Sequence, residues 1–379
     1  MGGRVRVALV RQRYNRYGGA ERFIERALPA LEAAGAEPTL IARSAEGWGA
    51  RRALVVNPPY LGSAWRDASF ARAARRTWES AGFDLVQSHE RIPGCDVYRA
   101  GDGVHAEWLD IRRAARGAAE ALGIALNPHH RHVCAAERAM FAHPRLSAVI
   151  CNSAMVRDEI RRRFGVDPSK LHVIHNGVDL SRFHPRERAA LRDGARARLG
   201  LGANDVAFLF VGSGFWRKGL DAAIAALAAA RDARFVLLVA GRDRHAGRFE
   251  AAARAAGVAA RVRLLGGQDD VRPMYAAADC FILPTRYDPF PSTALEALAM
   301  GVPAIVGRRS GAAEVVREGE SGAICDPGDP GGIAARMADA AHGRYSGEAA
   351  RRAAENHGLE DMASQLTALY ATLLRGRRP

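Results

Sequence analysis

The residues whose types and spacing best suit chemistry lie in the segment 280–306, CFILPTRYDPFPSTALEALAMGVPAIV. Asp288 lies in a loop after a buried apolar run, and Ser292 and Thr293 stand at the expected start of a helix as good N-cap residues. The free backbone N–H groups of such a helix start suit a phosphate. Glu296 follows about one turn later, so its carboxylate can accept hydrogen bonds from two neighbouring ribose hydroxyls, while Asp288 can hold sugar hydroxyls. Either acid alone would be an ordinary solvated side chain, but together they form the strongest cluster in the chain.

A basic pair follows the strand predicted at 207–211, where the chain reads GSGFWRKGLDAAIAAL. Gly212 opens this loop, and Arg217 and Lys218 stand just past the strand and just before a helix predicted at 220–230. A cationic pair in this position can grip a diphosphate and offset the negative charge that builds on a departing phosphate. The alternative is a solvated basic loop, and the position at the carboxyl end of a strand favours the functional interpretation.

Two weaker candidates lie in the first half of the chain. The segment RAGDGVHAEW follows a strand predicted at 97–100 and places Asp102 between two glycines, with His105 close behind. A carboxylate there can act as a base or orient an acceptor hydroxyl, although a turn-forming aspartate explains the segment equally well. Gly18 and Gly19 stand directly before a helix and allow a ligand to approach the backbone closely. This pair is not GxGxxG, so it predicts no dinucleotide site, and a plain loop is the alternative.

The elements that must position these residues are short apolar strands alternating with longer helical stretches, a pattern typical of βαβ units and parallel sheets. We therefore expect an α/β protein with two Rossmann-like, doubly wound parallel-sheet domains facing across a cleft, with ligands at the carboxyl ends of the strands. The domains are predicted at 1–178 and 179–358, with a hinge near residue 180, where VIHNGVD and a polar stretch with Pro185 interrupt the alternation. Apolar residues at helical spacing in 359–379 predict a helix that packs back toward the first domain.

The pattern predicts ten strands with defined bounds, a further short strand that ends in Asn176-Gly177 at the hinge, and nine helices. The strands are expected at 5–10, 38–42, 85–88, 97–100, 148–151, 207–211, 235–240, 261–265, 280–283 and 304–306. The helices are expected at 20–33, 64–81, 131–141, 155–164, 220–230, 248–256, 293–300, 333–341 and 360–375.

Composition narrows the class of protein. The 379 residues suit two domains, and the chain shows neither a long apolar run nor a secretory leader, so the sequence predicts a cytoplasmic protein. The five scattered cysteines form no CxxC pair, and Cys151 and Cys280 are expected to be inert buried hydrophobes. His129, His130 and His132 lack HExxH spacing, so no metal site is expected. The formal net charge of +14 favours anionic partners, but an Arg-rich composition throughout the chain explains it as well.

Taken together, these segments resemble the GT-B-fold, family 4 retaining glycosyltransferases over essentially the whole chain. The matching pieces are YGGAER, VIHNGVD, FLFVGSGFWRKG and DPFPSTALEALAMGVP. The family carries two glutamates separated by seven residues; Asp288 and Glu296 have this spacing, but the first is an aspartate. Its side chain is one methylene shorter, which puts its hold on the donor sugar, or the choice of sugar, in question. Within the family, the lipopolysaccharide core glucosyltransferase I group is most similar, through VGSGFWRKGLDAAIAAL, IPGCDVYRAGDGVHAEW and RHVCAAERAMF.

The resemblance implies a hexosyltransferase that uses a UDP-sugar, UDP-glucose in that group, without a metal or other cofactor, since Arg217 and Lys218 take the place of a divalent ion. It implies an inner-core heptose as acceptor, on an anionic glycolipid at the inner face of the inner membrane, with peripheral contact to anionic lipid. Asp102, Arg217 and Lys218 would be catalytic, and Asp102 and His105 would bind the acceptor. The donor site would comprise Gly18, Gly19, Gly212, Arg217, Lys218, Asp288, Ser292, Thr293 and Glu296.

The mechanism that follows is departure of the diphosphate from the face that the acceptor hydroxyl attacks; a double displacement through Asp102 is less favoured.

Three rival interpretations of the function remain. The same fold could use another NDP-sugar, or an acceptor of a capsule or exopolysaccharide pathway. A nucleotide-sugar 2-epimerase shares the two-domain architecture, but the RK loop and the spacing of Asp288 and Glu296 argue against it. Without a recognised motif or an interleaved basic and aromatic stripe, no nucleic-acid partner is expected.

Overall fold

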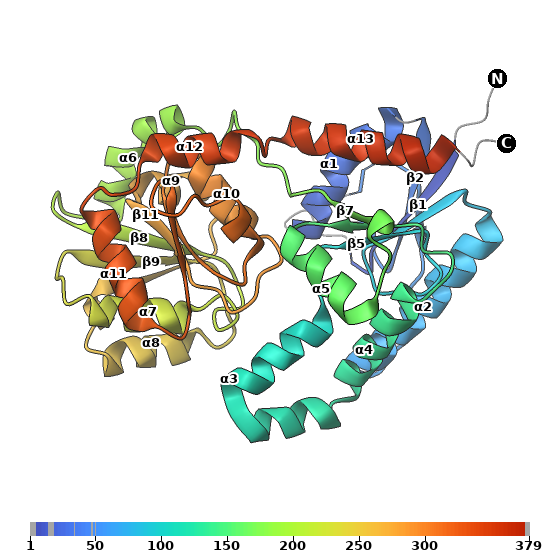
Figure 1. The fold of residues 1–379 in the computed structure, drawn as a ribbon, viewed down its shortest axis with the longest axis horizontal. Helices are drawn as coiled ribbons and strands as arrows, with labels where there is room; N and C mark the ends of the chain where they lie inside the picture. The colour runs from blue at the N-terminus through green and yellow to red at the C-terminus, as the bar shows by residue number, and fades with distance from the viewer. Residues whose placement is uncertain (1–4, 14–18, 34, 47, 50, 376–379) are drawn as a thin grey trace. The chain divides into compact units, whose positions relative to one another are not determined.

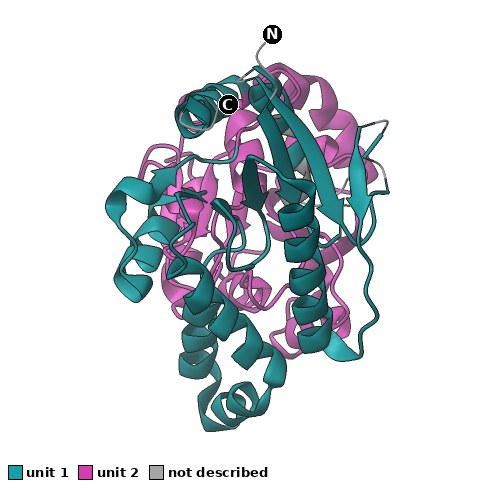
Figure 2. Ribbon diagram, turned by 90° about the vertical axis from the view of Figure 1, so that its right-hand side faces the viewer, with its two compact units in different colours: residues 1–176, 360–379 teal, residues 177–359 magenta. Residues whose placement is uncertain are grey.

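A computed structural model describes residues 5–13, 19–33, 35–46, 48–49 and 51–375 of the chain. The chain divides into two compact units (Figure 2). Unit 1 comprises residues 1–176 and 360–379, and unit 2 comprises residues 177–359. The last helix therefore belongs to the same unit as the start of the chain.

Unit 1 is built on a parallel sheet of seven strands in the order β3-β2-β1-β4-β5-β6-β7. The order reverses between β1 and β4, which pair from Val7 with Leu85 to Val10 with Ser88. The strands are β1 (Val5–Val10), β2 (Ala36–Ala42), β3 (Ala53–Val55), β4 (Leu85–Ser88), β5 (Val97–Ala100), β6 (Ala148–Cys151) and β7 (Leu171–Val173).

Helices cover both faces of this sheet (Figure 1). One apolar core joins the sheet to α1 and α13, and Leu366 and Tyr370 of α13 are fully buried in it. The other core joins the opposite face to α2, α4 and α5, and includes Phe70 and Trp78. The helices of this unit are α1 (Gly19–Ala33), α2 (Gly62–Ala81), α3 (His105–Leu126), α4 (Pro128–Phe141), α5 (Ala154–Phe164) and α13 (Leu359–Arg375), with a 3₁₀ turn at Pro168–Lys170.

Unit 2 repeats the plan with six parallel strands in the order β10-β9-β8-β11-β12-β13. Its sheet lies between α7, α8 and α11 on one face and α9, α10 and α12 on the other (Figure 1). The strands are β8 (Val206–Val211), β9 (Phe235–Ala240), β10 (Val262–Gly266), β11 (Cys280–Leu283), β12 (Ala304–Gly307) and β13 (Gly322–Cys325). The helices are α6 (Pro185–Arg198), α7 (Leu220–Ala229), α8 (Ala246–Ala255), α9 (Arg272–Ala277), α10 (Ser292–Ala299), α11 (Pro330–Ala341) and α12 (Gly347–Glu355), with 3₁₀ turns at Ala259–Arg261 and Gly311–Glu314.

Both sheets are doubly wound, as the sequence predicts, and each has one point at which the strand order reverses. In unit 1 this point lies between β1 and β4, and in unit 2 between β8 and β11. Helices that leave such a pair of strands cross opposite faces of the sheet, which opens a crevice at the carboxyl ends of the strands, where ligands bind. Cys151 and Cys280 are buried and free, as expected. Among the described helices, none is long and apolar enough to cross a membrane.

The prediction was wrong at several elements. The polar stretch after the hinge, where no helix was predicted, contains α6: His184 caps this helix, and Pro185 occupies its first turn, where a proline has no N–H to lose. The long helix α3 and the strands β3 and β13 were not expected at all. The cap of α10 also differs, since Pro291 is its N-cap and no side chain caps it. Ser292 and Thr293 are consequently the first two helical residues rather than caps.

Candidate functional site

The basic pair and Asp288 come together at the carboxyl ends of β8 and β11, where the strand order of unit 2 reverses. Lys218 Nζ lies 3.1 Å from Asp288 Oδ2, and Arg217 Nη1 lies 3.6 Å from the same oxygen. The Asp288 side chain is 9% exposed, and those of Lys218 and Arg217 are 11% and 33% exposed. One carboxylate thus faces two cations, and the Arg217–Lys218–Asp288 cluster carries one excess positive charge.

Hydrogen bonds tie the loop after β8 to the loop after β11. The backbone N–H of Arg286 and the hydroxyl of Thr285 each donate to the carbonyl oxygen of Arg217, at 2.9 Å. The guanidinium of Arg217 in turn donates to the carbonyl of Tyr287, at 2.9 Å. Because both the backbone and the side chain of Arg217 are held, the position of the basic pair is fixed by the fold rather than by a ligand.

Glycine is required at both ends of the basic loop. Gly212 has φ +154°, and a Cβ there would lie 2.5 Å from Cδ of Lys218, so a side chain would displace the lysine. Gly219 caps α7 with φ +79°, and a Cβ there would lie 2.0 Å from the carbonyl oxygen of Pro284. The two glycines therefore let Lys218 fold back over the end of β8 and let α7 begin against the neighbouring loop.

The charge state of Asp288 follows from two opposing effects. Burial is the larger single influence and disfavours the charged form, but the charges of Lys218 and Arg217 and hydrogen bonds to the carboxylate outweigh it. The pKa of the Asp288 carboxyl therefore lies below its ordinary value, and the group is ionised at neutral pH. An anionic ligand that takes the two cations must compete with this carboxylate.

Helix α10 begins beside the same loop. The Thr293 hydroxyl lies 3.5 Å from the carbonyl oxygen of Val211, the last residue of β8. Glu296, one turn further on, is only 4% exposed, and its Oε2 accepts a hydrogen bond of 3.0 Å from the hydroxyl of Tyr275. The same hydroxyl lies 3.0 Å from the carbonyl oxygen of Thr293, so its single proton is shared between the two acceptors. Tyr275 thus fixes both Glu296 and the first turn of α10.

In unit 1, Asp102 and His105 lie at the carboxyl end of β5. Asp102 is exposed on the turn between β5 and α3. His105 starts α3, and its backbone N–H donates to the buried carboxylate of Glu137 at 2.6 Å, while its Nε2 lies 3.1 Å from Nδ1 of His130. Burial, followed by the charge of Arg91, lowers the pKa of His105 to about 3, so the imidazole is neutral at physiological pH.

The remaining expectations for the first half concern glycines and histidines. Gly19 begins α1, whereas Gly18 lies outside the described residues. His105, His129 and His130 form a small cluster of rings with centroids 5.1 to 6.3 Å apart. Within the described ranges, no three His, Cys, Asp or Glu side chains are arranged to hold a metal ion.

Similarity to known protein families and relatives identifies the family of this chain. Residues 17–182 match the sequence model described as "Glycosyltransferase Family 4", and residues 192–357 match that of "Glycosyl transferases group 1". A D-inositol 3-phosphate glycosyltransferase of Streptomyces bingchenggensis is 30% identical over 350 residues, which cover 84% of this chain and 75% of the relative. The chain belongs to this glycosyltransferase family.

Two further glycosyltransferases are similar to this chain in sequence or in fold. The lipopolysaccharide glucosyltransferase WaaG of Escherichia coli is 25% identical over 323 residues, 84% of each chain. The crystal structure of WaaG superimposes with a TM-score of 0.81 at 22% identity and covers 96% of this chain and 99% of WaaG, which confirms the GT-B fold. HepE of Anabaena, solved in complex with UDP-glucose, gives a TM-score of 0.71 at 18% identity, covering 97% of this chain and 99% of HepE.

Two residues that support the site of the glycosyltransferase were missed in the sequence. Tyr275, which holds Glu296, lies in a short helix in which all four residues from Met274 to Ala277 are buried, so it looks like core. Arg286 braces the basic loop: its guanidinium pairs with both carboxylate oxygens of Asp221 at 2.8 and 2.7 Å and lies 4.6 Å from the ring centre of Trp216. The only signal for Arg286 is its position two residues before Asp288, in the loop that also carries the acid.

Proposed function

We propose that this glycosyltransferase transfers glucose from UDP-glucose to an inner-core heptose of lipopolysaccharide, with retention of configuration. The observation that carries the proposal is the Arg217–Lys218–Asp288 cluster, in which Lys218 Nζ and Asp288 Oδ2 are 3.1 Å apart at the switch point of unit 2. The two cations can bind a diphosphate, and the carboxylate beside them can accept a hydrogen bond from a hydroxyl of the attached sugar. Glucose and a lipopolysaccharide acceptor follow from similarity to the lipopolysaccharide glucosyltransferase WaaG, and UDP-glucose from similarity to HepE, which was solved in complex with it. The heptose is what the resemblance of the sequence motifs implies.

In this proposal the donor is bound by unit 2. Arg217 and Lys218 bind the diphosphate, and the uncapped first turn of α10, with Ser292 and Thr293, supplies further N–H donors to it. Asp288 accepts a hydrogen bond from a hydroxyl of the sugar. Glu296, oriented by Tyr275, accepts from the ribose hydroxyls.

The chemical step is a front-face substitution. The bond between the anomeric carbon and the phosphate oxygen breaks with its electron pair on that oxygen, and Lys218 and Arg217 stabilise the charge that develops there. The acceptor oxygen forms the new bond to the anomeric carbon on the same face, and its proton passes to the departing phosphate oxygen. Removal of one preorganised charge-stabilising group from such a site typically lowers kcat about 10²- to 10³-fold. The basic pair fills the role that a divalent ion has in other transferases, so the proposed reaction requires no metal.

The acceptor is assigned to unit 1. Asp102 is exposed on the turn after β5, where its carboxylate can orient the acceptor hydroxyl. His105 is neutral, so it can take part only as a hydrogen-bonding group and not as a cation. In unit 2, Gly212 lets the donor approach the backbone.

A donor screen tests the proposal. UDP-, GDP- and ADP-sugars are compared by thermal shift and calorimetry, because a ligand that binds the native state raises the melting temperature according to its affinity. Lys218→Ala is compared with Lys170→Ala, since these are the only two lysines of the chain and Lys170 lies in unit 1. We expect UDP-glucose to bind, the first variant to lose turnover, and the second to keep it. Failure of every nucleotide to bind, or unchanged turnover in Lys218→Ala, contradicts the proposal.

A second candidate keeps the fold and changes the substrates. Its support is the 30% identity to a D-inositol 3-phosphate glycosyltransferase, together with Asp288 in place of the longer glutamate, which alters the contact with the donor sugar. Transfer assays with heptose and inositol phosphate acceptors separate the two candidates, and NMR of the product anomer tests retention. Incubation with UDP-sugar alone excludes a 2-epimerase if no isomerised sugar forms.

Peripheral binding to an anionic membrane is part of the proposal. Large apolar side chains are exposed around the start of α2, with Tyr60 41%, Leu61 82% and Trp65 49% exposed, and the chain carries a net charge of +14. Aromatic and aliphatic side chains on a cationic protein are the combination that binds lipid headgroups and the outer acyl chains. We expect the wild type to co-sediment with phosphatidylglycerol vesicles and not with phosphatidylcholine vesicles. Leu61→Asp should co-sediment less with the phosphatidylglycerol vesicles.

A further inference from the structure

The segment 101–106 carries Asp102 and joins β5 to the first turn of α3. The N-cap residue of α3 is Val104, which has no side-chain group to cap the helix. The first N–H groups of an α-helix have no acceptor within the helix. Val104 is only 1% exposed, so the start of α3 depends on acceptors that other parts of the protein supply.

The carboxylate of Glu137, from α4, is this acceptor. Its Oε1 accepts a hydrogen bond of 2.6 Å from the backbone N–H of His105, and its Oε2 accepts one of 3.2 Å from that of Ala106. The Glu137 side chain is 1% exposed, and its charge is paired with Arg91, whose Nε lies 2.8 Å from Oε1. Glu137 therefore caps α3 from a neighbouring helix, in place of a residue just before α3 in the chain.

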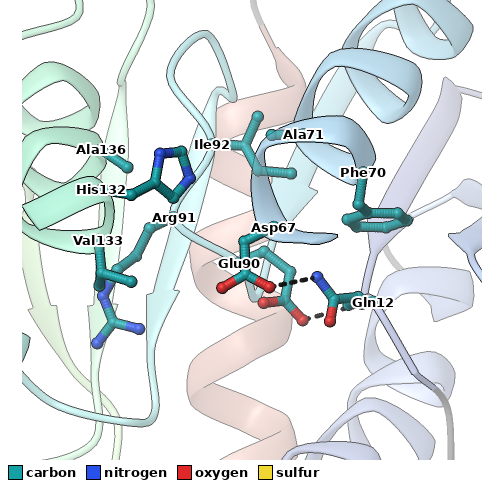
Figure 3. Close-up of a pocket in the computed structure, with 10 residues that line it drawn as sticks. All are labelled: Gln12, Asp67, Phe70, Ala71, Glu90, Arg91, Ile92, His132, Val133 and Ala136. Atoms are coloured by element: carbon teal, nitrogen blue, oxygen red, sulfur yellow. Dashed lines mark hydrogen bonds between the residues drawn. The ribbon is translucent and has the colours of Figure 1, made fainter. Parts of the chain in front are cut away.

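Arg91 connects this carboxylate to the turn before α3. It comes from the loop after β4, and its Nη2 donates to the carbonyl of Gly103 at 2.9 Å. Gly103 has φ +68°, a conformation that favours glycine. Figure 3 shows the Arg91 guanidinium on the side of Val133 of α4, away from Gln12. One guanidinium thus ties the carboxylate of Glu137 to the backbone of the turn.

Two further contacts hold the same segment. Asn152, buried just after β6, donates from Nδ2 to the carbonyl of Gly101 at 3.2 Å. The Nε2 atom of His105 lies 3.1 Å from Nδ1 of His130, so α4 contacts the imidazole of His105 as well as its backbone. All of these residues belong to unit 1, and their contacts leave the carboxylate of Asp102 exposed.

We propose that Glu137 and Arg91 are positioning residues for the proposed glycosyl transfer, which fix the turn from which Asp102 meets the acceptor hydroxyl. The inference rests on the proposed function, because that proposal assigns Asp102 to the acceptor. Burial lowers the pKa of the Arg91 guanidinium, but the negative groups around it, Asp102 among them, raise it above its ordinary value. Asp102 is therefore within electrostatic reach of the pair. A shift of about 1 Å in a group that orients a reactant can lower a rate about 10²-fold.

Three variants of the full chain test the inference. Glu137→Gln keeps the size of the side chain but replaces one of its two acceptor oxygens by an amide group that only donates. Arg91→Lys keeps the positive charge but lacks the planar fork that reaches both a carboxylate and a carbonyl.

Asp96→Asn is the matched control for Glu137→Gln. The Asp96 side chain is also 1% exposed, lies 3.2 Å from the guanidinium of Arg145, and accepts a hydrogen bond of 2.8 Å from the backbone N–H of Val86. Asp96 comes directly before β5, however, and so lies at the opposite end of this strand from the turn. The control therefore removes a buried carboxylate of the same kind without touching the segment 101–106.

Turnover is measured as release of UDP from UDP-glucose, with an inner-core lipopolysaccharide that ends in heptose as the acceptor. We expect Glu137→Gln to lower kcat about 10- to 100-fold and to change the KM for UDP-glucose less than about threefold, because the donor is assigned to unit 2. Arg91→Lys should lower kcat less, since it keeps the charge opposite Glu137. Asp96→Asn should lower the stability in urea but keep the kcat of the wild type.

Amide hydrogen exchange gives a second measurement that needs no turnover. The amides of His105 and Ala106 should exchange faster in Glu137→Gln than in the wild type or in Asp96→Asn. Full kcat in a folded Glu137→Gln or Arg91→Lys protein, an equal loss of kcat in Asp96→Asn, or unchanged exchange at these two amides overturns the inference. If Glu137→Gln does not fold, Arg91→Lys decides. If the wild type transfers no glucose, the proposed function fails, and the exchange rates still show whether Glu137 holds the turn.

Discussion

Replacement of Asp288 by asparagine should make the enzyme bind free UDP more tightly. In the structure the Asp288 carboxylate lies 3.1 Å from Lys218 and 3.6 Å from Arg217, so it already neutralises part of the charge that the diphosphate needs. Asparagine is nearly isosteric and leaves both cations, which raises the charge of the cluster by one unit. It also removes the charged acceptor proposed for the donor sugar, so the advantage of UDP-glucose over UDP should shrink.

The size of the effect follows from the distances. A phosphate in contact with the far side of Lys218 lies on the order of 6 Å from the carboxylate, where two unit charges interact by about 3 kcal/mol at an effective dielectric constant of 20 and by about 0.7 kcal/mol in bulk water. The cluster is partly exposed through Arg217, so the removed repulsion lies between these limits. About 1.4 kcal/mol, a tenfold gain in UDP affinity, is the expected value.

Calorimetric titration of UDP and UDP-glucose at low and high salt measures the effect. Glu348→Gln is the matched control, because its side chain is 80% exposed and the substitution changes the net charge by the same unit away from the cluster. The gain in Asp288→Asn should decrease as salt screens the exposed side of the cluster. Unchanged or weaker UDP binding in a folded Asp288→Asn protein would refute the argument that this carboxylate competes with the diphosphate.

Three further predictions concern the same loops. Gly212→Ala should weaken nucleotide binding by calorimetry at least as much as Lys218→Ala, because the new methyl would collide with the Lys218 side chain; an unaffected affinity would show that this lysine conformation is not the binding one. Acetylation followed by mass spectrometry should show that UDP protects Lys218 and not Lys170, and equal labelling of both lysines would contradict contact with the ligand. The lowered pKa of Asp288 stabilises the fold above its unfolded pKa of about 3.9. In urea unfolding, the stability difference between wild type and Asp288→Asn should therefore be constant near neutral pH and shrink as the pH falls below about 4; a constant difference down to pH 3 would contradict it.

The fold was predictable from the sequence where a buried element is a continuous or periodic run of apolar residues. The strands of both sheets are short runs of apolar residues between polar loops, and the observed β4, β5, β6, β9 and β11 have the predicted bounds. Helix α6 leaves no such trace, because only Ala195 of its residues is buried. It is held instead by arginines, with Arg188 and Arg192 donating to the carbonyl of Ala278 at 3.0 and 3.1 Å. Hydrophobic periodicity cannot detect a helix that docks through hydrogen bonds to backbone carbonyls.

Helix α3 was missed for a related reason. Only Leu109, Ile111 and Ile124 are buried along its 22 residues, so it has no continuous apolar stripe. Gly117 has φ +74° inside it and separates two helical segments, which breaks the period further. At the site, Asp102, Arg217, Lys218 and Asp288 follow the strands after which the sequence predicted them, but the sequence analysis treated Asp288 as a sugar ligand apart from the basic pair. Their ion pairs depend on a contact between loops that are about 70 residues apart in the chain, which local pattern does not encode.

The two units show how one topology carries two different sets of charged side chains. Each sheet reverses its strand order once, and each places polar residues on the two loops that flank the reversal. After β8 and β11 these are Arg217, Lys218 and a single acid, so the crevice of unit 2 is cationic. After β1 and β4 they are Arg11, Gln12, Glu90 and Arg91, and Arg11 Nη1 lies 3.3 Å from Glu90 Oε1, so charges of both signs are paired there. The strands fix where a ligand can bind and the loops fix which ligand it is. The proposed glycosyl transfer needs a site for a diphosphate, and the cationic loops of unit 2 carry the charge that the proposal assigns to it.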